Sequence, residues 1–152
     1  MSDKKILILY GTETGNSELL AMDAEKLAND LEFDVTVNGM DEITLSDIQD
    51  NGNVLIVCST WGDGEQPDNA IDLYESVEGS DDASMSGVGF AVLALGDTAF
   101  DLFCEAGIQW DNILQEKGGN RISERIDCDV DYEDDAEAWI EDTLNRFKET
   151  WK

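Results

Sequence analysis

Residues 5–17 of the chain read KILILYGTETGNS, an apolar run followed by small and hydroxylated residues. The first six have the length and composition of a buried strand, and the last seven form a loop that opens directly into a helical pattern. Backbone N–H groups at a helix N-terminus lack partners and carry partial positive charge, so they can bind a phosphate. The hydroxyls of Thr12, Thr14 and Ser17 would add donors there. The alternative is that these hydroxyls merely cap the helix.

The alternation of apolar run and amphipathic helix continues to the end of the chain. Further strands are predicted at residues 33–37, 54–58, 88–95 and, as an edge strand, 121–126. Helical patterns occur at residues 19–31, after Pro67, at about 103–114 and at 136–147. The inner strands are apolar throughout, as expected when helices cover both faces of a parallel sheet. The pattern predicts an α/β fold, a doubly wound five-stranded parallel sheet that binds ligands at the carboxyl ends of its strands.

Length and charge limit the classes of function. The 152 residues predict a single domain spanning residues 1–152. The formal net charge of −27 disfavours binding to nucleic acids or to anionic membranes. Such a surface suits a partner with a basic docking face, and it equally suits solubility or life at high salt. The N-terminal Met and the lack of a trailing linker favour a free-standing protein, although an excised domain would look the same.

The cysteine and histidine content excludes several kinds of site. The three cysteines, Cys58, Cys104 and Cys128, are widely spaced and odd in number, so buried reduced thiols are expected. With no histidine in the chain, Ser-His-Asp and Cys-His nucleophile systems and ordinary Cys/His zinc sites are excluded. Redox or transfer chemistry would then come from a bound cofactor. The N-terminal apolar run is too short for a secretory segment or a membrane span, which predicts a cytoplasmic protein.

The first loop resembles the phosphate loop of flavodoxins. It has no Lys, which excludes a Walker A loop, and it does not match the G-x-G-x-x-G fingerprint of dinucleotide-binding folds. Residues 11–17 read GTETGNS, similar to the flavodoxin pattern T/S-x-T-G-N-T/S after the first strand. The acidic side chain of Glu13 would have to point to solvent beside a phosphate.

The loops after the third and fourth predicted strands resemble the two flavin-binding loops of the same family. In residues 59–64, STWGDG, the resemblance assigns Trp61 to one face of the flavin ring, where aromatic stacking holds a flat ring well. An ordinary core position is the alternative for Trp61. Residues 96–104, GDTAFDLFC, are similar to the family's G-D-S-S-Y-x-x-F-C. Phe100 stands where the family usually has Tyr, so it keeps stacking but lacks the phenol.

The resemblance covers essentially the whole chain and implies the flavodoxin strand order 2-1-3-4-5. Residues 118–132 look most like the end of the flavodoxin-like domain of sulfite reductase flavoproteins, and the uninterrupted fifth strand region marks the short-chain type. The implied cofactor is one non-covalently bound FMN, with no catalytic residues and no metal ligands. The implied FMN-binding residues are Thr12, Glu13, Thr14, Gly15, Asn16, Ser17, Ser59, Thr60, Trp61, Gly62, Asp63, Gly64, Leu95, Gly96, Asp97, Phe100, Phe103 and Cys104.

The resemblance further implies a low-potential electron carrier, rather than an enzyme, that passes single electrons through a neutral semiquinone. In the family, the peptide after the stacking aromatic turns over in that state, and Gly62 permits both conformations. Asp63, Asp97 and Asp101, with the overall negative charge, should disfavour the fully reduced anionic flavin. The expected partners of the monomer are an NADPH-dependent flavin reductase or similar donor, and haem or iron–sulfur acceptor enzymes.

Three other functions occur on the same scaffold. A response-regulator receiver is rejected, because the acidic pair after the first strand and the aspartate at the end of the third are missing. A quinone reductase on this scaffold is disfavoured, since no additional substrate-binding or nicotinamide-binding segment is evident. A flavodoxin-like interaction or maturation module, with weak or no FMN binding and acting through its acidic face, remains the alternative.

Overall fold

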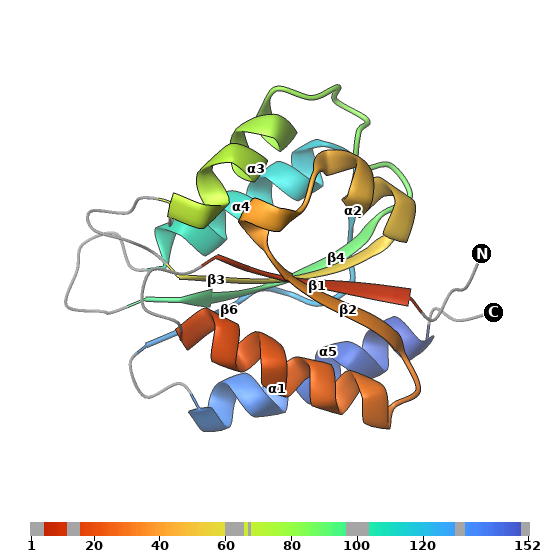
Figure 1. The fold of residues 1–152 in the computed structure, drawn as a ribbon, viewed down its shortest axis with the longest axis vertical. Helices are drawn as coiled ribbons and strands as arrows, with labels where there is room; N and C mark the ends of the chain where they lie inside the picture. Colours follow the sequence, from red (N-terminus) through yellow and green to blue (C-terminus); the bar gives the residue numbers. More distant parts are fainter. Residues whose placement is uncertain are drawn as a thin grey trace.

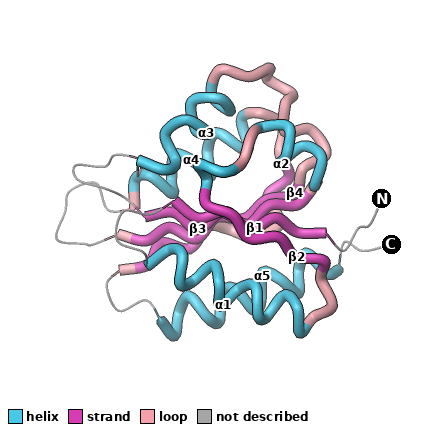
Figure 2. Tube along the Cα trace, viewed as in Figure 1, coloured by secondary structure: helices cyan, strands magenta, loops and turns pink. Residues whose placement is uncertain are grey.

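A computed structural model describes residues 5–11, 16–59, 66, 68–96, 104–129 and 133–149 of the chain. Over these residues a parallel sheet lies between two layers of helices (Figures 1 and 2). The four longer strands are β1 (Lys5–Gly11), β2 (Asp34–Gly39), β3 (Asn53–Ser59) and β4 (Gly89–Leu95). Two short strands, β5 (Asn120–Arg121) and β6 (Ile126–Cys128), both pair with β4. The order β2-β1-β3-β4-β5 confirms the predicted doubly wound sheet.

The edge strand departs from the sequence prediction, which has one continuous strand at residues 121–126. Phe90 pairs with Arg121 and Leu93 pairs with Ile126, so three steps along β4 face five steps along the edge. Two residues are in excess: the Ile122 N–H still donates to the Phe90 carbonyl at 2.8 Å, and residues 123–125 then leave the ladder. The prediction of one continuous strand was wrong, because local composition does not reveal a change of register between neighbouring strands.

The helices divide between the two faces of the sheet. Helices α1 (Asn16–Asp30) and α5 (Glu133–Glu149) cover one face, and α2 (Leu45–Asn51), α3 (Asp68–Glu78) and α4 (Glu105–Glu116) cover the other (Figure 1). Alternate side chains of each central strand enter different cores, so Ile8 contributes to the core under α1 and α5 and Leu9 to the core under α3 and α4. This two-sided burial explains why the strands are apolar throughout.

Helix α2, together with the 3-10 turn η1 (Met40–Glu42), has no counterpart in the sequence analysis. The signals for the helix are nevertheless local. Thr44 and Asp47 form a capping box, Ile48 is buried, and Gly52 ends the helix in a left-handed conformation with φ of 84°. A helix of 7 residues gives too few turns for an apolar periodicity to stand out, although its caps could have identified it.

The cysteines are free and buried in the structure, which confirms the expectation of reduced thiols. Within the described ranges, no helix combines the length and the apolar character that crossing a membrane requires.

Candidate functional site

The carboxyl ends of β1, β3 and β4 meet at one edge of the sheet, on the left in Figure 1. Gly11 pairs with Cys58, and Ser59 pairs with Leu95, so the three strands end in adjacent positions. Of the predicted FMN-binding residues, the structure describes the backbone of Asn16 together with Ser17, Ser59, Leu95, Gly96 and Cys104. The others lie outside the described residues: Thr12, Glu13, Thr14, Gly15, Thr60, Trp61, Gly62, Asp63, Gly64, Asp97, Phe100 and Phe103.

A pair of hydroxyls joins the first loop region to the second. Helix α1 begins at Asn16, and Ser17 in its first turn is fully buried. The Ser17 Oγ lies 2.6 Å from the Oγ of Ser59 at the end of β3, close enough for a hydrogen bond in either direction. The N-terminus of α1 is therefore held against the carboxyl end of β3, where the helix N–H groups favour an anion.

Two polar side chains near the start of α3, Gln66 and Asn69, make contacts that were not predicted from the sequence. The Gln66 Nε2 donates to the Ala106 carbonyl and to the Gln109 Oε1, both at 3.0 Å, and the Gln66 Oε1 accepts from the Trp110 indole at 2.9 Å. The Asn69 Nδ2 donates to the Tyr10 carbonyl at 3.2 Å. These bonds tie the start of α3 to β1 and to α4. No sequence signal marks them, because each partner lies at least 40 residues away.

The carbonyl of Cys128 in β6 accepts hydrogen bonds from Gly96, directly after β4, and from Cys104, directly before α4. It accepts from the Gly96 backbone N–H at 2.9 Å and from the Cys104 thiol at 3.6 Å. The same thiol also lies 3.5 Å from the Ala94 carbonyl. Burial raises the pKa of the Cys104 thiol to about 12, so the group stays protonated at neutral pH and acts as a weak donor. Only glycine fits at position 96, since a Cβ there would lie 2.8 Å from the Cys104 nitrogen.

Negative charge also approaches this edge. The Tyr10 hydroxyl donates to the Glu18 carboxylate at 3.0 Å. The pKa of Tyr10 is raised to about 12, mainly by burial and secondly by the hydrogen bond to Glu18. Among the described residues at the ends of β1, β3 and β4 there is no Lys or Arg. The arrangement suits a ligand with a phosphate bound by hydroxyl and N–H donors, and a polar ring edge facing backbone groups. FMN fits this set of donors.

Comparison with known proteins identifies the relatives of the chain. The family model described as Flavodoxin matches residues 8–139. The sulfite reductase [NADPH] flavoprotein alpha-component of Bacillus subtilis (strain 168) is 41% identical over 146 residues, 96% of this chain and 24% of that protein. The corresponding protein of Vibrio parahaemolyticus is 36% identical over 96% of this chain and 23% of its own length. The chain thus spans about a quarter of the length of these relatives.

Solved structures give the same picture at the level of the fold. A flavodoxin of Streptococcus pneumonia TIGR4 superposes with a TM-score of 0.86 at 27% identity, covering 95% of this chain and 98% of that one. The oxidised Flavodoxin 2 of Bacillus cereus superposes with a TM-score of 0.84 at 28% identity, covering 97% and 99%. The likeness therefore extends over nearly the whole of these structures.

Proposed function

Because the chain belongs to the flavodoxin family, we propose that it is an electron carrier that passes single electrons between a reductase and acceptor enzymes. The family binds FMN and transfers electrons, and FMN is the cofactor of this chain. The bound FMN supplies the redox chemistry, and the protein binds and orients the cofactor. The observation that carries the proposal is the convergence of Ser17, Ser59 and Gly96 at the carboxyl ends of three adjacent strands.

Each described group has a proposed part in binding. The N–H groups of the first turn of α1, with the Ser17 hydroxyl, would hold the phosphate. Backbone groups at Leu95, Gly96 and Cys104 would hold the polar edge of the ring. Trp61 and Phe100 are proposed to stack on the ring, as the sequence resemblance implies. Residues 1–152 are proposed to act as one FMN-binding domain.

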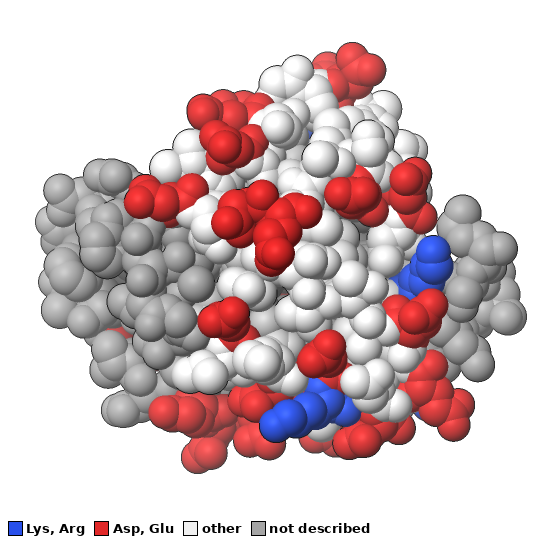
Figure 3. Space-filling model, viewed as in Figure 1, with Lys and Arg blue, Asp and Glu red and all other residues white. Residues whose placement is uncertain are grey.

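Charge supports the proposal of one-electron transfer through a neutral semiquinone. The chain carries a formal net charge of −27, and acidic side chains spread over the face seen in Figure 3. Such a surface disfavours a further negative charge on the bound ring, which makes the second reduction the harder one. Asp63, Asp97 and Asp101 are proposed to contribute locally, and Gly62 to accept a hydrogen bond from the ring.

The proposed partners are an NADPH-dependent flavin reductase or similar donor, and haem or iron–sulfur acceptors with basic docking faces. The matched relatives are named as NADPH sulfite reductase flavoproteins, and the acidic surface complements a basic partner. We propose that the chain acts as a monomer in the cytoplasm.

An anaerobic titration with dithionite tests the function. The purified protein is loaded with FMN, the free flavin is removed, and the visible spectrum is recorded at each step. The expected result is a retained yellow flavin that passes through a long-wavelength blue absorbance at half reduction. The Ser17→Ala protein serves as the matched variant and should retain less FMN. A colourless protein that takes up no FMN would overturn the proposal and favour an interaction module that acts through its acidic face.

A further inference from the structure

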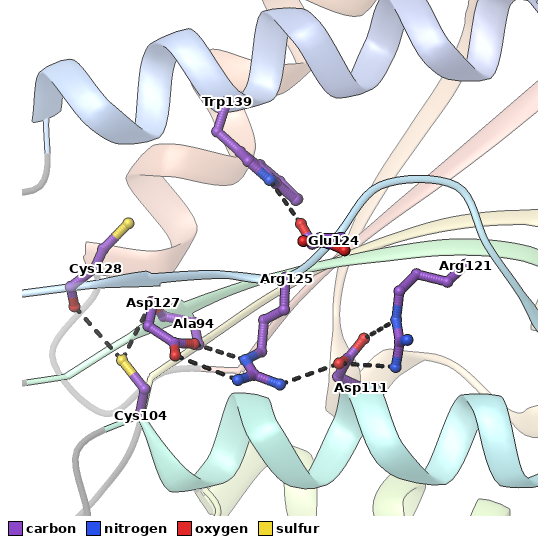
Figure 4. A network of polar contacts seen from close by, with 9 residues as sticks. All are labelled: Ala94, Cys104, Asp111, Arg121, Glu124, Arg125, Asp127, Cys128 and Trp139. Carbon is purple, nitrogen blue, oxygen red and sulfur yellow. Dashed lines mark hydrogen bonds and ion pairs between the residues drawn. The ribbon is translucent and has the colours of Figure 1, made fainter.

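Two arginines from the edge of the sheet converge on one buried carboxylate (Figure 4). The side chain of Asp111 in α4 is only 6% exposed. The Arg121 Nε and Nη2 donate to its two oxygens at 2.9 and 3.0 Å, and the Arg125 Nη1 donates to the Oδ2 at 3.1 Å. Both oxygens of the carboxylate are therefore satisfied, as a buried charge requires.

Arg125 extends the network to β6. Its Nε and Nη2 donate to the two oxygens of Asp127 at 2.7 and 3.3 Å. The bond to Asp127 is the main cause that raises the pKa of Arg125, which keeps the guanidinium charged. One planar side chain thus joins α4, through Asp111, to β6, through Asp127. A lysine has no such fork of donors.

The next residue in β6 is Cys128, whose carbonyl accepts from Gly96 and Cys104. Cys104 is in turn the N-cap residue of α4, the helix that carries Asp111. The contacts therefore form a closed circuit from α4 through Arg125 to β6 and back through Cys104. Figure 4 shows both links of this circuit beside one another.

Strand pairing with β4 holds β6 over only the short stretch from Ile126 to Cys128. β6 has only 3 residues, and the two excess residues before it break the ladder that would continue from β5. Arg121 lies in β5 and Arg125 is the last residue before β6, and both donate to Asp111. The chain has 9 Lys and Arg in all, so placing two of them here is a large share of its positive charge.

We propose that Asp111, Arg125 and Asp127 are positioning residues of the FMN site, because they fix the Cys128 carbonyl that anchors Gly96 and Cys104. This inference rests on the proposed FMN-binding function. Arg121 differs in role: it holds Asp111 and Gln115 but makes no hydrogen bond or ion pair with β6 among the contacts of the described residues. It stabilises the network without setting the position of the carbonyl.

The test compares three variants that each remove one positive charge. Arg125→Met breaks the link to β6, and Arg121→Met removes the other arginine of the network. Arg146→Met removes an exposed i,i+4 pair with Asp142 on α5 and serves as the control for net charge. For each protein, the FMN dissociation constant is measured by quenching of flavin fluorescence. The exchange rate of the Gly96 amide is measured in the FMN-free protein, and stability is measured by urea unfolding.

Arg125→Met should weaken FMN binding about tenfold or more, since a charge-assisted link is lost, and it should speed exchange of the Gly96 amide. Arg121→Met should lower stability with less than about a twofold change in affinity, and Arg146→Met should change neither. Arg125→Lys should not restore affinity, because the two-carboxylate bridge needs the guanidinium fork.

Equal affinities for Arg125→Met and Arg121→Met at equal stability would overturn the positioning role. Unchanged Gly96 exchange in Arg125→Met would do the same. Failure of the wild-type protein to bind FMN would instead refute the proposed function, while the exchange measurement still decides whether the network positions Gly96.

Discussion

Replacing Gly107 by alanine should push α4 away from the sheet. Gly107 lies in α4 directly over Ala94 of β4, and a Cβ at position 107 would lie 2.2 Å from the Ala94 Cβ and 2.9 Å from its Cα. Ordinary contact begins at about 3.4 Å, so the two elements must separate by about 1.2 Å. Ala94 is fully buried, and β4 pairs with strands on both sides, so the helix rather than the strand must move.

The expected cost follows from two opposing effects. Overpacking of a rigid core costs about 1–3 kcal/mol and occasionally more, and this contact is severe. Alanine in place of glycine inside a helix returns about 1 kcal/mol. The net loss in the free energy of unfolding should be about 2 kcal/mol. With a urea m value of about 2 kcal/mol/M, the unfolding midpoint should fall by about 1 M.

The measurement is urea unfolding of the FMN-free protein at fixed salt, with Gly79→Ala as the control. A Cβ at position 79 meets only the Glu75 carbonyl at 3.4 Å, so that variant should stay within about 0.5 kcal/mol of wild type. Because Cys104 caps α4, the Gly107→Ala protein should also bind FMN more weakly. A Gly107→Ala protein as stable as wild type would refute the reasoning from close packing.

Three further results are expected. Stability should rise with NaCl, because the Debye length falls from about 30 Å at 0.01 M to about 3 Å at 1 M and screens the repulsion of a −27 chain; a flat response in urea unfolding would count against this. In the folded protein the pKa values of Cys104 and Tyr10 are raised to about 12, from ordinary values of 9.0 and 10.0, so the unfolded chain loses these protons at lower pH than the folded chain. The stabilisation from these two groups should therefore be complete below pH 9 and lost by about pH 12. Alkaline unfolding followed by circular dichroism measures this loss. Ser17→Ala should lower the free energy of unfolding by about 1 kcal/mol, since it leaves the Ser59 hydroxyl without its partner. An exposed change such as Ser76→Ala should leave the free energy of unfolding unchanged, and urea unfolding measures both variants.

The sequence by itself determined the architecture of the chain. Each central strand is a local apolar run, and a loop rich in small residues directly follows the first, third and fourth of the predicted strands. The apolar periodicity and the order of strands and helices along the chain could therefore be predicted without knowledge of tertiary contacts. The order of strands and the cofactor followed from the motifs of the loops. Helix α2 was also locally encoded, in the caps at Thr44 and Gly52, although the sequence analysis did not assign it.

Only the tertiary structure decided which polar side chains, remote from one another in the sequence, come into contact. Gln66 meets α4, and Asp111 meets Arg121 and Arg125, through contacts that depend on how the helix is placed over the sheet. The break between β5 and β6 likewise depends on register against β4, which no local pattern specifies. The physical reason is that a hydrogen bond or ion pair needs its atoms within about 3 Å. Distances on that scale between remote residues are set by packing of the whole core, whereas strands and helices follow from neighbours in the chain.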